Sequence, residues 1–209
     1  KDIKIKYSRL QHILLESLES SPPCPFIESS CKIKHDWKFN HNKDTITLSG
    51  NIVQSLPDYL NEIKCLNYTK TLRLAICLGI QLGILSDYNY GILHFNIKDI
   101  MVIDENWFLL TNLSNLTELL EDNKLNIIKP ISPGSYLAPE LKLVKALPAK
   151  VYSSCAYYSL ALLCIDVYGF DKIITDIKLD LEIIRRTPLY FLLKRCLDKN
   201  PTNRVFLLI

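Results

Sequence analysis

The stretch YGILHFNIKDIMVIDENWFLLTNLS, residues Tyr90–Ser114, decides which fold is expected. It holds two short apolar runs, Ile100–Ile103 and Trp107–Thr111, separated by Asp104-Glu-Asn106. Two apolar runs joined by so few polar residues predict a tight β-hairpin. A polar loop, His94–Asp99, comes directly before this hairpin. The stretch therefore predicts a loop rich in polar groups beside a small buried sheet.

Helices are expected on both sides of this hairpin, because apolar residues there recur at helical spacing. One of them, Lys70–Tyr88, is apolar around most of its circumference and carries Gly79 and Gly83 four residues apart, which favours a close helix crossing. The segment Ser114–Lys150 contains several prolines and is expected to be loop-like with some helix. The other predicted helices are Leu56–Leu66, Tyr152–Tyr168, Asp176–Arg186 and Leu189–Leu197.

The first fifty residues favour strands. Lys1–Tyr7 alternates apolar and charged residues and predicts a strand, and Ser8–Leu18 has helical spacing. Phe26–Phe39 and Thr45–Leu48 are expected to form a hairpin around the polar turn Asn40–Asp44. Ser49–Ser55, around Gly50, is expected to be a linker. The order of strand, helix, two strands and a mostly helical body predicts an α+β fold.

The composition excludes several kinds of site and partner. Only six glycines occur in 209 residues, where an average chain would have about fifteen. None of them forms a G-x-G-x-x-G or P-loop pattern, so no glycine-rich phosphate site is expected. A net charge of +3 is too small to indicate nucleic-acid binding. The longest apolar runs, Ala75–Leu85 and Tyr157–Phe170, are interrupted by Gln81 and Asp166, so no membrane span is expected.

Seven cysteines without a C-x-x-C pair favour a reducing compartment over a disulfide framework. Cys77 and Cys164 lie in apolar helical patterns, where a free thiol packs as a small hydrophobe. An intracellular protein, cytoplasmic or nuclear, is therefore expected. One group of metal-ligand types has spacings that fit no common zinc finger, so we expect no metal there: Cys24, Cys31, His35 and His41.

Four segments in this order resemble a protein kinase. Tyr90–Ser114 is similar to the catalytic loop, the hairpin after it and the metal-binding triplet, and PGSYLAPE (Pro133–Glu140) is similar to the end of an activation segment. YYSLALL (Tyr157–Leu163) resembles the central helix of the large lobe, and CLDKNPTNR (Cys196–Arg204) the turn before its last helix. The resemblance implies one kinase-like domain, with an abbreviated small lobe in residues 1–50 and a mainly helical large lobe in residues 51–209.

The residues that carry kinase chemistry are replaced. Against the pattern H-R-D-L-K-x-x-N, this chain has His94-Phe95-Asn96-Ile97-Lys98, followed by Asp99, Ile100 and Met101. Asn96 stands in place of the catalytic base, and a neutral amide cannot accept the hydroxyl proton. Met101 stands in place of an asparagine that holds Mg²⁺, and a thioether is a poor ligand for that hard cation. Lys98 matches the lysine of this loop, and we interpret it as a relic or a surface charge.

The metal-binding triplet D-F-G is replaced by Asn112-Leu113-Ser114, so the carboxylate that holds Mg²⁺ across the phosphates is missing. The buried aspartate of the central helix falls at Ala156. Lys4 or Lys6, with Glu16, is a candidate for the lysine–glutamate pair of a kinase small lobe. Phosphoryl transfer depends on positioning and on charge, so these replacements imply an inactive domain without a cofactor.

Glu140 and Arg204 match residues that the resemblance retains. Glu140 closes the Ala138-Pro139-Glu140 motif, and Arg204 matches the arginine that pairs with this glutamate in kinases. The resemblance implies a bidentate ion pair that fastens the activation segment to the terminal helices. His94, after an apolar run, is expected to be a packed structural histidine.

The leading hypothesis is a pseudokinase domain that acts through protein partners as a scaffold or allosteric module. The first alternative is an enzyme with rewired chemistry that uses Asp99 or Asp104, although a solvated or turn-forming aspartate is the simpler interpretation of each. The second is a KIND-type module, a non-catalytic large lobe that binds peptides. The third is a helical bundle that carries the motifs by chance and keeps Glu140 and Arg204 apart.

Overall fold

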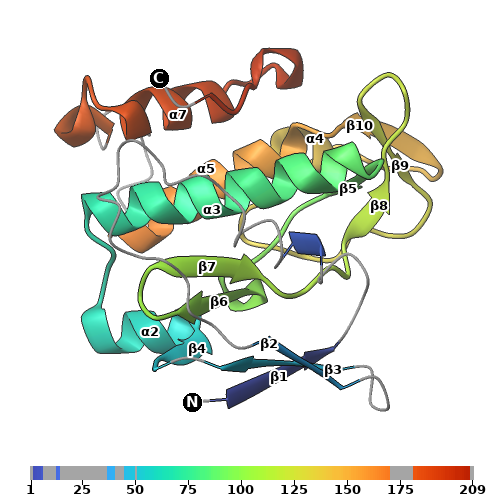
Figure 1. The fold of residues 1–209 in the computed structure, drawn as a ribbon. Helices are drawn as coiled ribbons and strands as arrows, with labels where there is room; N and C mark the ends of the chain where they lie inside the picture. Colours follow the sequence, from blue (N-terminus) through green and yellow to red (C-terminus); the bar gives the residue numbers. More distant parts are fainter. Residues whose placement is uncertain are drawn as a thin grey trace.

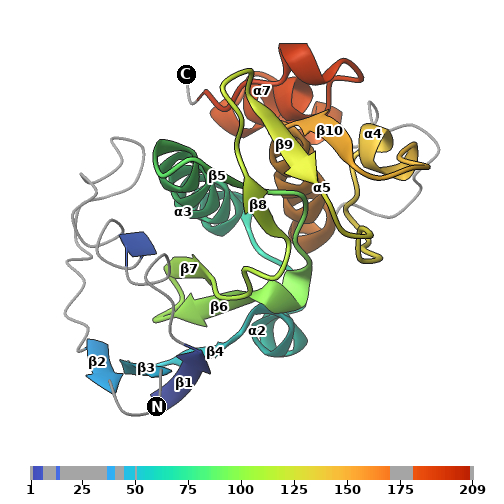
Figure 2. The ribbon, with the colours of Figure 1, turned by 90° about the vertical axis from the view of Figure 1, so that its right-hand side faces the viewer.

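The computed structural model describes residues 2–6, 13–14, 37–40, 45–49, 51–169 and 181–207. Across this part the fold is α+β, as predicted. Helices α3 (Tyr68–Asp87) and α5 (Cys155–Tyr168) lie side by side through the middle of the molecule. Helix α7 (Pro188–Cys196) lies beside α5, and the hairpin of β6 and β7 (Ile100–Ile103, Trp107–Leu110) lies against α3 (Figures 1 and 2).

The remaining elements are short. The strands are β1 (Asp2–Lys6), β2 (Trp37–Asn40), β3 (Thr45–Ser49), β4 (Val53–Ser55), β5 (Tyr90–Ile92), β8 (Leu116–Glu118), β9 (Lys124–Ile127) and β10 (Ala149–Tyr152). The helices are α2 (Leu56–Ile63) and α4 (Pro139–Lys142), with single 3-10 turns at Ile97–Asp99, Glu182–Ile184 and Pro201–Asn203.

The N-terminal strands form one antiparallel sheet in the order β1-β3-β2. Its registers pair Ile3 with Leu48 and Trp37 with Leu48, so β3 is the central strand. The predicted hairpin of β2 and β3 is confirmed. Of the predicted helix Ser8–Leu18 only Ile13 and Leu14 are described, and both are helical. Most of the predicted strand Phe26–Phe39 lies outside the described residues.

The predicted linker Ser49–Ser55 is wrong, because its end forms strand β4. Val53 pairs with Ile103 and Ser55 pairs with Met101, so the predicted hairpin becomes a three-stranded sheet in the order β4-β6-β7. Three residues are too few to show a period-two pattern, and pairing with a strand about fifty residues away defines β4.

The segment Ser114–Lys150 is also more regular than predicted. It supplies β8 and β9, the helix α4 and the first residues of β10. Strand β8 pairs with β5, and β9 pairs with β10. Leu125 and Ile127 are buried while Lys124 and Asn126 are more exposed, so β9 does alternate, although over only four residues. Long-range pairing stabilises these strands, and local sequence does not indicate it.

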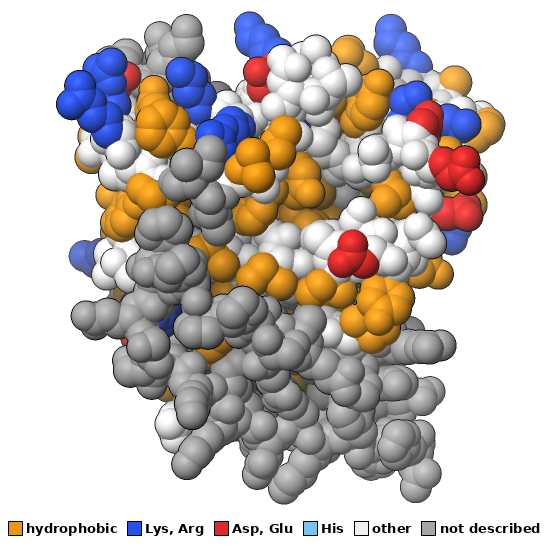
Figure 3. Space-filling view, turned by 45° about the horizontal axis from the view of Figure 1, so that its top comes forward, with side chains coloured by type: hydrophobic (Ala, Val, Ile, Leu, Met, Phe, Trp, Pro, Cys, Tyr) orange, Lys and Arg blue, Asp and Glu red, His pale blue; other side chains and the backbone are white. Residues whose placement is uncertain are grey.

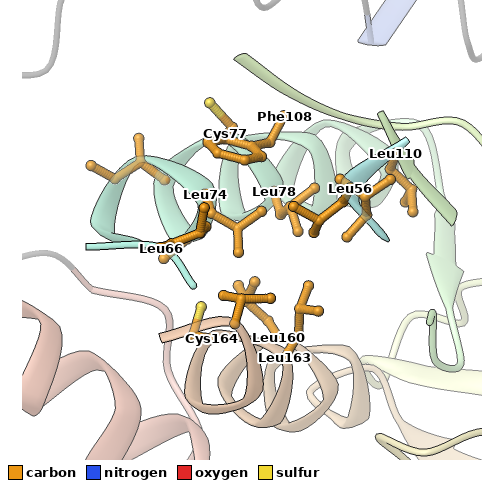
Figure 4. Packing of buried hydrophobic residues seen from close by; sticks show 14 of the residues in the cluster. Leu56, Leu66, Leu74, Cys77, Leu78, Phe108, Leu110, Leu160, Leu163 and Cys164 are labelled. Carbon is orange, nitrogen blue, oxygen red and sulfur yellow. The ribbon is translucent and has the colours of Figure 1, made fainter. Parts of the chain in front are cut away.

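The core between α3 and α5 follows from their apolar faces. Leu74 and Leu78 of α3 point toward Leu160 and Cys164 of α5 (Figure 4). Helix α3 begins after Asn67, whose side chain accepts a hydrogen bond from the Lys70 N–H at 2.9 Å. Helix α5 ends at Gly169, which has a φ of 71° and so allows the chain to leave the helix.

Gln81 is a polar residue buried on α3, and from the sequence alone it is only an interruption of an apolar run. Its side chain is fully buried and faces β7. The amide Nε2 donates to the Phe108 carbonyl at 2.8 Å, and Oε1 accepts from the Leu110 N–H at 2.9 Å. A further bond runs from Nε2 to the Cys77 carbonyl at 2.9 Å. Gln81 thus forms hydrogen bonds with the backbone at the outer edge of β7, as a neighbouring strand would.

The two glycines of α3 do not mark a helix crossing, which corrects that prediction. A Cβ at Gly83 would meet no atom within 4 Å. A Cβ at Gly79 would lie 1.9 Å from Cζ of Phe206, so this glycine makes room for an aromatic ring from the C-terminal segment. The Phe206 ring also packs 5.9 Å from the ring of Tyr157, centre to centre. The segment after residue 204 is therefore fastened across α3 and α5.

By length and composition, one helix of the described part is able to cross a membrane, and it is α3, with a mean hydropathy of 1.2. It passes this test because the helix extends beyond the run Ala75–Leu85 at both ends. Within the fold 61% of the apolar 18-residue stretch of α3 is buried, as in a core helix.

Five cysteines lie in the described part, and all five are free thiols. Cys77 and Cys164 are buried among apolar side chains, as predicted. At the C-terminus, the predicted helix Leu189–Leu197 is confirmed as α7. Of the predicted helix Asp176–Arg186 the structure describes residues 181–186, and within these Glu182–Ile184 form a 3-10 turn rather than a regular α-helix.

Candidate functional site

The loop between β5 and β6 carries most of the candidate residues, and its apolar members anchor it. Phe95 is 1% exposed and belongs to the main core, although the matching kinase residue is an arginine that receives phosphate. Met101 is buried in β6, opposite Ser55 and Leu109. Lys98 is exposed on the 3-10 turn Ile97–Asp99. The loop therefore exposes the cation of Lys98 and buries the side chains of Phe95 and Met101.

Asp99 is the carboxylate of this loop, and it is buried. Its Oδ2 accepts a hydrogen bond from the Asn96 N–H at 2.7 Å, and its Oδ1 accepts one from the Asn112 side-chain amide at 2.7 Å. The Asp99 carbonyl accepts further bonds from the N–H and hydroxyl of Thr111 at 2.8 and 3.1 Å. Of the two interpretations given above, a solvated or a turn-forming aspartate, the solvated one is wrong, because Asp99 is buried. Asp99 caps its own turn and ties the loop to Asn112.

Asn96 lies under the segment that begins at Pro133. Its Oδ1 accepts a hydrogen bond from the Ser135 N–H at 3.3 Å. A Cβ on Gly134 would lie 3.2 Å from that oxygen and 2.7 Å from Nδ1 of His94. Gly134 is therefore required by close approach of the backbone, rather than by a positive φ. The amide of Asn96 binds the neighbouring segment and offers no basic group to a substrate.

His94 is fully buried, as predicted, and forms a closed ring of hydrogen bonds. Its Nε2 lies 3.2 Å from the Ser132 hydroxyl oxygen, which donates to Oδ1 of Asn115 at 2.8 Å. The Asn115 amide then donates to the His94 carbonyl at 3.0 Å. Because Ser132 donates to Asn115, the ring assigns the proton of the imidazole to Nε2, and Nδ1 remains without a partner. The hydroxyl of Ser132 is thus not activated as a nucleophile.

Burial lowers the pKa of the His94 imidazole below its ordinary value of about 6.5. Well above its unfolded pKa of about 6.5, the ring is neutral in both the folded and the unfolded chain. There its contribution to the free energy of unfolding is at its maximum. As the pH falls below that value, the unfolded chain takes up the proton first, so the free energy of unfolding decreases by at most about 1.4 kcal/mol per unit of pH. We expect this slope in urea denaturation, and we expect His94→Gln to remove it.

A chain in which His12, His35 and His41 are replaced by glutamine is the control, because it should keep the slope. If that control loses the slope and His94→Gln keeps it, a different histidine titrates on unfolding.

The tip of the β6–β7 hairpin is held by α2 and α3. Asp104 and Glu105, at the centre of the turn, both have positive φ, which suits a tight antiparallel turn. Asp104 accepts a hydrogen bond from the Ile52 N–H at 2.9 Å, so it acts as a turn former, one of the two interpretations given above. Glu105 pairs with Lys70 at 2.7 Å and accepts from the Tyr59 hydroxyl at 3.1 Å. The hydrogen bond from Lys70 lowers the pKa of the Glu105 carboxyl.

Helix α5 holds the segment Pro133–Glu140 by polar contacts. The Ser159 hydroxyl donates to the Tyr136 carbonyl at 2.7 Å, and the Tyr136 hydroxyl donates to Asp166 at 2.5 Å. Burial, and then the neighbouring carboxylate, raise the pKa of Tyr136 above its ordinary value. Ala156, at the position where kinases have a buried aspartate, is buried and apolar. Ser159 and Asp166 therefore supply the contacts of α5 to this segment.

Glu140 and Arg204 form the ion pair that the resemblance implies. Nη1 of Arg204 lies 2.5 Å from Oε1 of Glu140, and Nη2 lies 3.0 Å from Oε2. The Arg204 side chain is completely buried, its Nε donates to the Asp198 carbonyl at 2.7 Å, and its guanidinium lies 4.8 Å from the centre of the Tyr158 ring. The helical-bundle alternative is therefore wrong, since it kept this pair apart and had no sheets.

Several candidates lie outside the part of the chain that the structure describes. The side chains of Lys4 and Lys6, and the whole of Glu16, lie outside the described residues. The candidate zinc residues Cys24, Cys31, His35 and His41 lie outside them as well. Within the described ranges, no group of three or more His, Cys, Asp or Glu side chains is placed to hold a metal ion.

Sequence reasoning missed the residues that bind these loops to one another. Asn115 and Ser132 carry no recognisable signal, because their partners lie in other segments. Gln81 and Asp166 did carry one, since each is a polar residue inside an otherwise apolar helix. Such a residue is buried only when it has a hydrogen-bond partner, and so it predicts a specific contact.

The chain matches no known protein-family model and no curated protein sequence.

Proposed function

We propose that this chain is a protein kinase-like domain without catalytic activity, which acts as a protein-binding scaffold or regulatory module. The observation that carries the proposal is the state of Asp99. It is the carboxylate of the polar loop, and both of its oxygens already accept hydrogen bonds, from Asn96 and Asn112. Phosphoryl transfer requires free carboxylates for Mg²⁺ and a base for the hydroxyl proton, and this loop offers neither.

Two further features support the kinase-like interpretation. The bidentate pair of Glu140 and Arg204 joins the two segments that the resemblance matches to the activation segment and the terminal helices. The order of elements also agrees, with a small N-terminal sheet, a hairpin after the polar loop and a buried helix α5. We place this role inside the cell, because the five described cysteines are free thiols.

Two alternatives are less well supported. A rewired enzyme would use Asp99 or Asp104, but Asp99 is buried in structural hydrogen bonds and Asp104 binds the Ile52 backbone. A KIND-type module would consist of a large lobe alone, and the sheet β1-β3-β2 before residue 50 favours a retained part of a small lobe.

Nucleotide binding separates the inactive domain from the rewired enzyme. We expect the Tm to change by less than about 1 °C in millimolar ATP with Mg²⁺, because a ligand stabilises a protein only when its concentration exceeds its Kd. Differential scanning fluorimetry with and without Mg²⁺ measures this. A large shift that depends on Mg²⁺, and that Asp99→Asn abolishes without lowering the Tm of the free protein, would favour the enzyme.

A further inference from the structure

Helix α7 has two unlike faces. Leu189, Leu192, Leu193 and Cys196 are buried, and the helix packs on α5. Phe191, Lys194 and Arg195 are spaced three and four residues apart and so share the opposite face. Phe191 lies on this face and is 42% exposed, so a large part of its aromatic ring is open to solvent.

The C-terminal segment extends this face. Phe206 turns inward to the site above Gly79, so its neighbours Val205 and Leu207 face outward and are exposed. Leu207 is fixed beside α7, because its carbonyl accepts a hydrogen bond from Nη1 of Arg195 at 3.3 Å. An exposed leucine thus lies next to the basic residues of the helix.

Before α7 begins, Ile183 and Arg186 are likewise an exposed apolar side chain and an exposed basic one. Ile183 is 77% exposed, the highest value among the large apolar residues of the described part. In the space-filling view from the side of α7, several Lys and Arg side chains and apolar side chains lie along the top of the molecule, with acidic side chains among them (Figure 3). We call these apolar and basic residues of the segment 181–207, each at least partly exposed, the α7 surface: Ile183, Arg186, Phe191, Lys194, Arg195 and Leu207.

The charge of the α7 surface is not neutralised locally. Residues 181–207 contain six Lys and Arg against two acidic residues, and because the buried Arg204 is paired with Glu140 outside this segment, the remaining excess is three positive charges. Both carboxylates are engaged elsewhere, since Glu182 pairs with Arg185 at 3.1 Å and Asp198 accepts from the Asn200 N–H at 2.8 Å. Among the described residues, no carboxylate forms an ion pair with Arg186, Lys194 or Arg195.

We propose that the α7 surface binds an acidic segment of a protein partner, one that carries Asp and Glu around a bulky apolar side chain. The cations complement the acidic residues, and Phe191 with Leu207 provides an apolar contact of the kind that dominates binding energy. The inference rests on the proposed function only in taking the chain to be a binding module.

A protein partner fits this surface better than a bilayer or a nucleic acid. A helix that lies on a membrane inserts an apolar face separate from its cations, but the apolar face of α7 packs in the core and its exposed Phe191 lies among cations. A single-stranded nucleic acid stacks successive bases on several planar groups, whereas the α7 surface has one aromatic ring, Phe191, and its other apolar side chains, Ile183 and Leu207, are aliphatic.

The test uses the whole chain and two fluorescent synthetic peptides, measured by anisotropy. The first peptide has Asp and Glu around one Phe and two Leu, and the second has the same charges with Ser in place of the apolar residues. We expect the first peptide to bind about tenfold more tightly than the second. We expect Phe191→Ser, Lys194→Glu and the pair Lys194→Glu/Arg195→Glu each to weaken it by about tenfold or more.

The matched control is Lys142→Glu/Lys145→Glu, which makes the same change of charge at two exposed lysines on and after α4 and should alter the Kd by less than about twofold. Arg195 also binds the Leu207 carbonyl, so its replacement removes a contact of the C-terminal segment, and Lys194→Glu alone is included because it leaves this bond intact. Each variant must also keep the Tm of the wild type.

Three results would overturn the proposal. They are no binding of the first peptide, an equal loss in the control pair, or tighter binding of phosphatidylserine vesicles or oligo-dT through the same residues. None of them bears on ATP binding, so the proposed function and this inference fail separately.

Discussion

Replacing Glu140 with alanine is expected to lower the free energy of unfolding by about 3–5 kcal/mol, a fall of roughly 6–20 °C in Tm. The Arg204 side chain is completely buried, so the substitution leaves a guanidinium in the core without its counter-charge. Its bonds to the carbonyls of Asp198 and Lys199 remain, but these satisfy N–H groups and not the positive charge. Urea denaturation and thermal melting measure the loss.

Two variants separate the ion pair from a general effect of losing a glutamate. Glu121 is exposed and forms no hydrogen bond or ion pair in the described structure, so Glu121→Ala should change stability by less than about 0.5 kcal/mol. Glu140→Gln keeps one acceptor for Arg204 and should lie between alanine and wild type. If Glu140→Ala melts at the same temperature as Glu121→Ala, the pair does not fasten the segment Pro133–Glu140, and the kinase-like interpretation loses its main structural support.

The parts of the fold that sequence predicted are those with local signals. Helix α3 has twenty residues of helical pattern and an asparagine at its start. The β6–β7 hairpin has two apolar runs around a three-residue polar turn. Both signals are contained within the element, so neither depends on what packs against it.

The missed strands depend on distant partners. Strands β4 and β5 have three residues each, and they pair with segments that begin about fifty and twenty-five residues later. At this length no periodicity can be recognised, and the partner strand defines the element. Strand β10 is missed for the same reason. The sequence predicts a loop for its first residues and the start of a helix for its last residue, Tyr152.

The site, too, has features that the local sequence predicts and features that depend on distant partners. That Asn96 and Asn112 are neutral follows directly from the sequence, and so does the absence of a base in that loop position. That Asp99 is buried does not follow, because its burial depends on Asn112, which lies across the hairpin. A carboxylate that the sequence places on the surface therefore binds both the Asn96 backbone and the Asn112 side chain.

Gln81→Leu is expected to cost about 2–5 kcal/mol, although leucine suits a buried helix. The substitution leaves the Phe108 carbonyl and the Leu110 N–H buried and unpaired, and each such group costs about 1–3 kcal/mol. Gln54→Leu is the matched control, because Gln54 makes a single 3.4 Å bond to the exposed Glu62. If the two variants lose equal stability in urea, the contact of Gln81 with β7 contributes nothing specific.

Gln81→Glu tests the geometry itself, because only the protonated acid has the hydrogen-bonding pattern of the amide. One oxygen then accepts from the Leu110 N–H while the other donates to the Phe108 carbonyl, whereas an ionised carboxylate faces that carbonyl with a lone pair. Burial therefore raises the pKa of the introduced Glu in the folded chain above its unfolded value of about 4.3. Its folded form is stable below that unfolded pKa and loses stability as the pH rises through the folded pKa. We expect the gap in free energy of unfolding between Gln81→Glu and wild type to narrow from about pH 7 to pH 4.5, whereas the gap for Gln81→Leu stays constant. A Gln81→Glu gap that does not depend on pH would show that this side chain does not bridge Phe108 and Leu110.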